Sequence, residues 1–248
     1  MDIAIAGAGI AGLSAAAFFG RAGHRVCVFD KAPAPAAVGS GLIVQPTGQA
    51  ALAALGLLDD LKRRGARLDR LDGRLPGGRR KVLDVRYAAL GPDVFGISVH
   101  RAALFELLLR AAREAGAAFH YGREVAGVAD DGADMRVVFS NGAGSEPFDL
   151  VIDGLGVKSP LIERRNSFLD YGALWANAPF PSEYGFADNV LNQRYRGAGC
   201  SSGVMPIGTM REGGEKLAAF FWTLRADEYA SWRSAPLSHW KEKVIALW

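Results

Sequence analysis

Cysteine and histidine are scarce in this sequence. Its 248 residues include two cysteines, Cys27 and Cys200, which are too few for a disulfide framework and show no metal-ligand spacing. The four histidines are scattered without an H-x-x-x-H or Cys/His pattern, so we predict no metal site. The sequence also lacks a G-x-S-x-G segment, which argues against the hydrolases that use this motif. This residue usage predicts a reduced protein of the cytoplasm.

A strong excess of one charge is also absent. The chain has 29 Lys and Arg against 26 Asp and Glu, and the net charge of +3 is too small to indicate a nucleic-acid partner. Hydrophobic residues make up 50% of the chain, without any biased tract, which predicts a folded protein of one or two domains.

One long stretch, from Ile3 to Gly20, contains no charged residue. A signal peptide would have basic residues before such a stretch, whereas the only charge in front of it is Asp2. Three glycines at positions 7, 9 and 12 also interrupt it, which is unlike a membrane helix. We therefore predict a buried strand, a glycine turn and a buried helix, and no integral membrane segment.

This N-terminal segment contains a G-x-G-x-x-G motif. Residues 7–12 (GAGIAG) follow an apolar strand at 2–6 and open a predicted helix at about 10–22, and a second strand at 24–30 ends on Asp30. In such a unit Gly7 allows a tight turn, Gly9 lets the backbone approach a pyrophosphate, and Gly12 allows the helix to pack on the strand. The carboxylate of Asp30 suits the ribose of either NAD or FAD, so the motif predicts a dinucleotide site without selecting the dinucleotide.

The chain beyond residue 38 does not continue as a simple alternation of strands and helices. A glycine-bearing loop and an apolar helix occupy 39–58, short antiparallel strands are predicted within 72–98, and a helix is predicted at 100–116. His100, at the start of that helix, is interpreted as a capping or surface residue. Three further strands are predicted at 124–129, 135–140 and 148–153.

This order resembles that of the group A flavoprotein monooxygenases, the aromatic hydroxylases related to para-hydroxybenzoate and salicylate hydroxylase. Four segments carry the resemblance: GAGIAGLSAAAFFGRAGHRVCVFDK, GSGLIVQPTGQAALAALGL, SVHRAALFELLL and DLVIDGLGVKSPLIER. The resemblance implies FAD as the cofactor and assigns its binding to Gly7, Gly9, Ile10, Ala11, Gly12, Asp30, Lys31, Gly41, Arg101, Val125, Asp153 and Gly156.

The last of these segments departs from the family pattern. Leu155 stands where the family has an aspartate linked to both FAD and the nicotinamide coenzyme, and Asp153 stands where a glycine is usual. Asp153 lies two positions away, so its side chain points the same way from an extended chain. Whether it replaces the missing aspartate is left open at this point.

The fold class that the resemblance implies is α/β, with a Rossmann-like FAD-binding domain and an antiparallel-sheet substrate domain like that of para-hydroxybenzoate hydroxylase. The predicted FAD-binding domain comprises residues 1–70 and 97–165, and the predicted substrate domain comprises 71–96 and 166–248. Within the latter, 191–199 and 216–226 are predicted strands. By the same resemblance, the candidates for the substrate pocket are Gln193, Tyr195, Met205 and Trp222.

The implied activity is hydroxylation of a small aromatic substrate with NAD(P)H as co-substrate and O2, through a flavin C4a-hydroperoxide. Two alternatives stay open: an FAD- or NAD-linked oxidase or reductase without oxygen insertion, and a degenerate, non-catalytic relative. Family members are longer, and the resemblance implies that a Gly-Asp segment contacting the flavin lies beyond residue 248. We therefore interpret the chain as an N-terminal portion of such a hydroxylase; its oligomeric state is not predicted.

A run of basic residues between positions 62 and 81 has two interpretations. Asp59 and Asp60 lie just before it and Asp69 and Asp72 within it, which favours a solvated surface, and the alternative is a patch that attracts the phosphates of NAD(P)H. The run comprises Lys62, Arg63, Arg64, Arg67, Arg70, Arg74, Arg79, Arg80 and Lys81.

Overall fold

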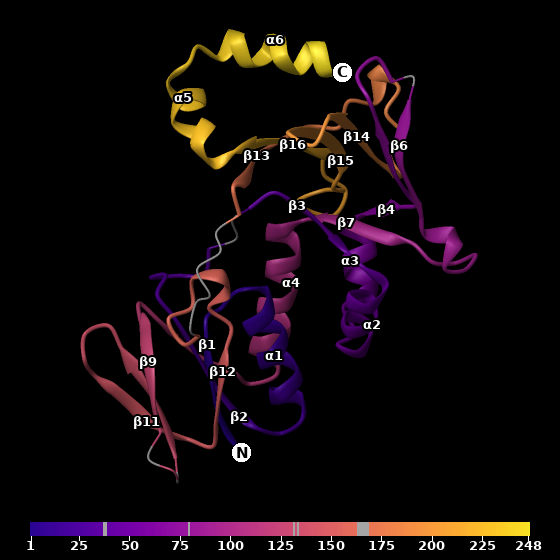
Figure 1. The fold of residues 1–248 in the computed structure, drawn as a ribbon. Helices are drawn as coiled ribbons and strands as arrows, with labels where there is room; N and C mark the ends of the chain where they lie inside the picture. Colours follow the sequence, from indigo (N-terminus) through magenta and orange to yellow (C-terminus); the bar gives the residue numbers. More distant parts are fainter. Residues whose placement is uncertain (37–38, 79, 131, 133, 163–168) are drawn as a thin grey trace. The chain divides into compact units, whose positions relative to one another are not determined.

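The computed structural model describes the chain except for residues 37–38, 79, 131, 133 and 163–168. Arg79 of the basic run and the last two residues of the segment DLVIDGLGVKSPLIER, at 149–164, therefore lie outside the described residues. The chain forms two compact units (Figure 1). The first comprises Met1–Val38 and Leu104–Asn166, and the second comprises Gly39–Ala103 and Ser167–Trp248.

The first unit is built on a parallel four-stranded sheet in the order β12-β1-β2-β8. These strands are β1 (Asp2–Ala6), β2 (Arg25–Asp30), β8 (Ala118–Tyr121) and β12 (Leu150–Asp153). Helix α1 (Ile10–Arg21) connects β1 to β2, which confirms the predicted strand, glycine turn, helix and strand. Because Ile3, Ile5 and Leu13 are fully buried, the charge-free run is explained by a core that covers strand and helix alike.

A second, antiparallel sheet of three strands follows in the same unit. Its strands are β9 (Val125–Asp130), β10 (Met135–Phe139) and β11 (Gly144–Phe148). The rings of Phe139 and Phe148 lie 5.2 Å and 6.0 Å from that of Phe29 on β2, so aromatic packing joins this sheet to the parallel one.

Helix α4 (Arg101–Glu114) begins in the second unit and continues into the first. It confirms the helix predicted at 100–116. A Cβ atom at Gly20 of α1 would lie 2.5 Å from the carbonyl oxygen of Ala115, directly after α4. The absence of a side chain at Gly20 therefore allows α1 to approach the end of α4.

The second unit contains a six-stranded sheet in the order β13-β16-β15-β14-β5-β6 and a three-stranded sheet in the order β3-β7-β4. The larger sheet comprises β13 (Tyr171–Pro179), β16 (Leu217–Arg225), β15 (Cys200–Pro206), β14 (Val190–Arg196), β5 (Arg70–Arg74) and β6 (Lys81–Arg86). The smaller one comprises β3 (Gly41–Val44), β7 (Gly96–His100) and β4 (Ala66–Leu68). The strands predicted at 191–199 and 216–226 are confirmed as β14 and β16.

The remaining elements of this unit are helices. They are α2 (Pro46–Ala54), α3 (Leu58–Arg64), α5 (Tyr229–Ser234) and α6 (Leu237–Leu247). Short 3-10 turns are η1 (Tyr87–Ala89), η3 (Ser182–Tyr184) and η4 (Ala226–Glu228), and η2 (Gly156–Lys158) lies in the first unit.

The two faces of the six-stranded sheet bury different side chains. One face packs Met205, Ala219 and Phe221 into a cluster with residues of the smaller sheet. The other packs Trp222 and Leu224 with Leu247 of α6, and α5 and α6 lie over the sheet in Figure 1. Because side chains alternate along a strand, neighbouring residues of β16 belong to separate cores.

The parallel and antiparallel sheets match the predicted α/β fold class. Residues 39–70 and 97–103 pack with the second unit, and their assignment to the FAD-binding domain stays a prediction. Among the described residues, the helices are all too short or too polar to cross a lipid bilayer.

Candidate functional site

The G-x-G-x-x-G loop packs three stretches of main chain together. A Cβ atom at Gly12 would lie 1.9 Å from the carbonyl oxygen of Gly7, and one at Gly7, where φ is +98°, would lie 2.6 Å from the carbonyl oxygen of Gly154. The N–H of Gly154 donates to the carbonyl oxygen of Ala6 (2.8 Å). The loop after β1, the start of α1 and the loop after β12 are therefore in contact through glycine backbone alone.

The start of α1 is open, in contrast to the packed glycines beside it. Gly9 is the N-cap residue, without a side-chain cap, and a Cβ atom there would have no neighbour within 4 Å. The first helical bond runs from the Leu13 N–H to the Gly9 carbonyl oxygen (2.9 Å), so the N–H groups of Ile10, Ala11 and Gly12 have no helical acceptor. Three donors and open space at a helix N-terminus fit the diphosphate of a dinucleotide.

Asp30 lies at the end of β2 beside this loop. Its Oδ2 accepts a hydrogen bond from the Ala8 N–H (2.7 Å) and its Oδ1 accepts one from the Ala32 N–H (2.8 Å). These bonds fix the carboxylate against the glycine loop, and each oxygen keeps a lone pair for a ribose hydroxyl. Lys31, the next residue, is exposed.

Asp153 stabilises its own loop. Its Oδ1 accepts from the Leu155 N–H (2.9 Å) and its Oδ2 accepts from the hydroxyl of Ser159 (2.6 Å), which is buried. The side chain of Leu155 packs against the core cluster of Phe29 and its neighbours. Asp153 thus shapes the turn before Gly156, where φ is +74°, and its role toward a coenzyme stays a prediction.

The side chain of Val125 is also part of that core. It is buried in one cluster with Phe139 and Phe148. In this packing the side chain is not available to a cofactor, so a contact with FAD at Val125 would involve the main chain.

In the second unit, Arg101 is held at the first turn of α4 by its neighbours. Its N–H donates to the carbonyl oxygen of Ser40 (2.8 Å), and a Cβ atom at Gly39 would lie 2.7 Å from the Cδ of Arg101. The stem of the arginine therefore passes directly over Gly39, and its side chain is exposed.

Three polar side chains, which we call the Arg101 clamp, lie around this position. The clamp comprises Ser40, His100 and Asn177. The Ala102 N–H donates to Nδ1 of His100 (3.1 Å), the Asn177 amide lies 2.8 Å from Nε2, and the Ser40 hydroxyl donates to Oδ1 of Asn177 (2.6 Å). His100 is buried and caps α4, which confirms one of its two interpretations, whereas Ser40 and Asn177 carry no signal in the sequence.

Three of the four substrate-pocket candidates share a face of the six-stranded sheet. Gln193 and Tyr195 alternate with Leu191, which belongs to the same buried cluster as Met205. Met205 also meets a predicted cofactor residue, because a Cβ atom at Gly41 would lie 2.8 Å from its Cε. The structure therefore brings candidates from both predicted groups together.

Aromatic rings cover part of this face. The Tyr195 ring lies over Gly73, where a Cβ atom would be 2.6 Å from it, and the Phe221 ring lies over Gly203 (2.2 Å). Burial raises the pKa of Tyr195, which favours the protonated phenol still further. The Oε1 of Gln193 is buried without a hydrogen-bond partner among the described residues, which is unusual for a buried amide oxygen.

Trp222 lies apart from the other three candidates. It is on the opposite face of the sheet, where its ring is 6.1 Å from that of Trp240 on α6, and it belongs to the cluster of Leu224 and Leu247. Its proposed contact with substrate stays a prediction, and its position in the structure is that of a packing residue.

The glycine loop, the uncapped helix and the acid at the end of β2 together define a dinucleotide-binding α/β fold. Comparison with known proteins identifies the family. The FAD binding domain family matches residues 1–152, and the chain belongs to this family. The resemblance to the group A flavoprotein monooxygenases is thereby confirmed.

Curated relatives have similar sequences. The chain is 29% identical over 164 residues to a 6-hydroxynicotinate 3-monooxygenase of Bordetella bronchiseptica. The aligned region covers 65% of this chain and 42% of the relative. It is 26% identical over 257 residues to a 6-methylpretetramide 4-monooxygenase of Streptomyces rimosus, covering 99% of this chain and 58% of the relative. The chain thus spans about half the length of these relatives.

A solved structure shows the same fold. PqsL of Pseudomonas aeruginosa, described as a probable FAD-dependent monooxygenase, superposes with a TM-score of 0.74 at 21% sequence identity, covering 93% of this chain and 62% of PqsL. The predicted fold class is therefore confirmed.

Proposed function

We propose that this chain forms the FAD-binding part of a monooxygenase that hydroxylates a small aromatic substrate with NAD(P)H and O2. The observation that carries the proposal is the open, uncapped N-terminus of α1 between Gly9 and the carboxylate of Asp30, in a chain of the FAD binding domain family. The free thiols of Cys27 and Cys200 support the location in the cytoplasm that we propose.

The residues of the first unit bind and orient the cofactor in this proposal. The N–H groups at the start of α1 donate to the diphosphate, and the helix dipole favours its negative charge. Asp30 accepts hydrogen bonds from the ribose hydroxyls. FAD, when bound, supplies the redox chemistry by taking a hydride from NAD(P)H and activating O2.

The residues of the second unit orient the cofactor and substrate. The main chain of Arg101 is fixed by its bond to the Ser40 carbonyl oxygen, and its exposed guanidinium is the group that would contact the flavin. Tyr195 and Phe221 lie on the face of the sheet that we assign to the substrate pocket, where their rings would pack against an aromatic substrate. The phenol of Tyr195 and the unpartnered Oε1 of Gln193 are the groups that would position a substrate hydroxyl.

A titration and an activity assay test this function. Purified chain is titrated with FAD, followed by flavin fluorescence, and the complex is then assayed for NAD(P)H oxidation and oxygen consumption with hydroxybenzoates and hydroxypyridine carboxylates. We expect FAD to bind and one class of aromatic acid to stimulate both rates. A chain that takes up no FAD would contradict the cofactor assignment.

The alternatives are an FAD-linked oxidase or reductase without oxygen insertion and a non-catalytic relative. One observation favours them: Leu155 replaces the family's aspartate, and the nearby Asp153 uses both oxygens within its own loop. Bound FAD that NAD(P)H reduces without substrate-stimulated oxygen consumption would identify the first, and bound FAD that is never reduced would identify the second.

A further inference from the structure

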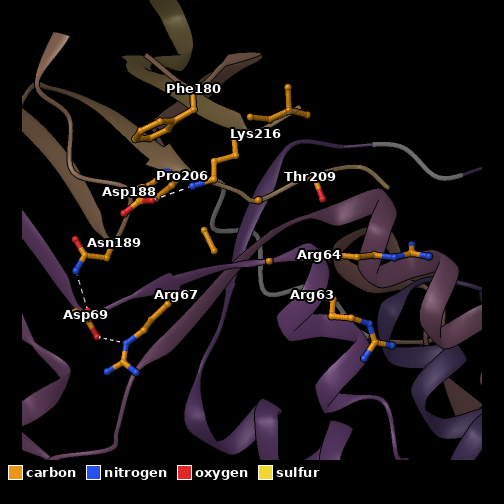
Figure 2. Close-up of a pocket in the computed structure, with 14 residues that line it drawn as sticks. Arg63, Arg64, Arg67, Asp69, Phe180, Asp188, Asn189, Pro206, Thr209 and Lys216 are labelled. Carbon is orange, nitrogen blue, oxygen red and sulfur yellow. Dashed lines mark hydrogen bonds and ion pairs between the residues drawn. The ribbon is translucent and has the colours of Figure 1, made fainter. Parts of the chain in front are cut away.

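A cavity of about 450 Å³ lies in the second unit, beside the end of α3 and the connection between β15 and β16 (Figure 2). Gly208 in this connection has φ of +67°, and a Cβ atom there would lie 1.9 Å from the carbonyl oxygen of Arg64. The Thr209 N–H donates to the same oxygen (2.7 Å). These contacts fix this part of the cavity lining through main chain.

Charged groups line opposite sides of the cavity. Figure 2 shows Asp69, Asp188 and Asn189 on one side and the two arginines of α3 on the other. Both carboxylates are already engaged: Asp69 accepts from Arg67 (2.7 Å) and from Asn189 (2.9 Å), and Asp188 accepts from Lys216 (3.1 Å). The lining as a whole has four cationic side chains against these two carboxylates, which favours an anion, and the side formed by α3 holds two of the four.

Arg63 and Arg64 form that side. Arg63 pairs with Asp60 through Nη2 and with Glu212 through Nε (3.3 Å). A guanidinium has five N–H donors, so these two pairs leave donors of Arg63 for a ligand. Arginines suit phosphate because their planar fork binds two oxygens at once.

A hydroxyl in the same lining has no partner. The Oγ1 of Thr209 is buried and has no hydrogen-bond partner among the described residues. Buried hydroxyls are nearly always satisfied, which points to a polar group of a ligand at this position. Phe180, Pro206 and Leu217 supply apolar surface beside it, so the lining fits a molecule with an anionic group and an apolar body.

Three other residues of the basic run form ion pairs away from this cavity. Arg70 and Arg74 pair with the buried Asp72, and Lys81 with Asp84, along β5 and β6. The structure thus divides these residues into a cluster on β5 and β6 that pairs with Asp72 and Asp84, and a group of three arginines, at positions 63, 64 and 67, that lines the cavity.

We propose that this cavity binds the phosphate-bearing adenosine part of NAD(P)H. The inference rests on the proposed function, which requires a nicotinamide coenzyme. The phosphate contacted is either the diphosphate, which NADH and NADPH share, or the additional 2′-phosphate of NADPH. The connection between β15 and β16 also contains Ile207, whose carbonyl oxygen accepts from the N–H of His100, next to Arg101.

The test measures direct binding of NADPH and NADH to FAD-saturated chain by equilibrium dialysis, without turnover. We expect Arg64→Glu to weaken coenzyme binding about tenfold or more, because it replaces an attraction for phosphate by a repulsion. Thr209→Val removes only the hydroxyl, so we expect weaker coenzyme binding with no loss of thermal stability. Arg233→Glu, the same charge change on α5, is the matched control and should bind as the wild type does.

The outcomes separate the two phosphates and the two proposals. If only NADPH binding is weakened, the cavity contacts the 2′-phosphate. If the binding of both coenzymes is weakened, it contacts the diphosphate, and either result supports the proposal. Unchanged binding in both variants would overturn it, as would displacement of the coenzyme by inorganic phosphate at equal concentration. If the chain binds no FAD, the same dialysis on apo-protein still tests the cavity. If NAD(P)H reduces bound FAD equally well in Arg64→Glu, the cavity assignment fails while the proposed function stands.

Discussion

Three glycines of one motif have different surroundings in this molecule. At Gly7 and Gly12 a side chain would collide with main chain, whereas at Gly9 it would enter open space. The first two are therefore required by the fold, and Gly9 is required only by whatever occupies the space in front of α1. This difference allows binding to be tested apart from folding.

Gly9→Asp should have opposite effects on stability and on binding. The backbone at Gly9 is extended (φ −77°, ψ −176°), as at an N-cap, and aspartate there caps a helix well. We expect the apo-protein to unfold at the same or a higher temperature, while FAD binding is lost because the carboxylate repels the diphosphate. The measurements are thermal unfolding by circular dichroism and FAD titration.

Two variants serve as controls for this prediction. Gly9→Ser caps the helix without adding charge and should weaken FAD binding less than Gly9→Asp does. Gly12→Ala should destabilise the protein even without FAD, because its Cβ meets the Gly7 carbonyl oxygen. FAD binding by Gly9→Asp at wild-type affinity would contradict the placement of the diphosphate.

At the scale of elements, the start of α4 depends on a single side chain. The imidazole of His100 accepts the Ala102 N–H and replaces the usual serine or aspartate cap. His100→Ala should cost about 0.5–2 kcal/mol of stability, and His100→Asn, which can also cap, should recover part of it. Urea denaturation measures both, and equal stability of the alanine variant and the wild type would exclude the capping role.

The hairpin of β5 and β6 should lose stability in acid. Hydrogen bonds from Arg70, and also from Arg86 and Lys81, hold the pKa of Asp84 well below its ordinary value. The folded state therefore binds this proton less readily than the unfolded state, so the stabilisation is complete above about pH 5 and disappears as the pH falls toward about 2.

Asp84→Asn tests this dependence. The difference in melting temperature between wild type and variant should shrink as the pH is lowered through that range. Asp93→Asn, at an exposed aspartate of the same unit, is the charge-matched control. A difference that grows in acid would show that the carboxylate is not held by its three cationic neighbours.

Helix α6 is attached to the six-stranded sheet by Leu247. This side chain is completely buried against Trp222 and Leu224. Leu247→Ala should therefore reduce the free energy of unfolding by about 2–5 kcal/mol, the usual cost of such a cavity. Exposed Leu237→Ala, at the other end of the helix, should cost much less in the same urea titration, and equal costs would contradict the packing.

For the molecule as a whole, the features that could be predicted from the sequence were local. The glycine loop, α1 and Asp30 lie within 30 consecutive residues, and their spacing alone indicates how they pack. The Arg101 clamp could not be predicted, because Asn177 meets His100 across 77 positions. The sequence also could not show that Trp222 lies on the opposite face of the sheet from Gln193 and Tyr195. Alternation tells which residues of one strand share a face, but only the pairing of β14, β15 and β16 relates the faces of different strands.

The tryptophans of this protein are unevenly distributed. All five, at positions 175, 222, 232, 240 and 248, belong to the second unit, and the first unit has none. Tryptophan fluorescence therefore reports on the second unit alone. Substitutions at the glycine loop should leave its wavelength unchanged, whereas Leu247→Ala should shift it to the red, so a single spectrum indicates which half a variant has disturbed.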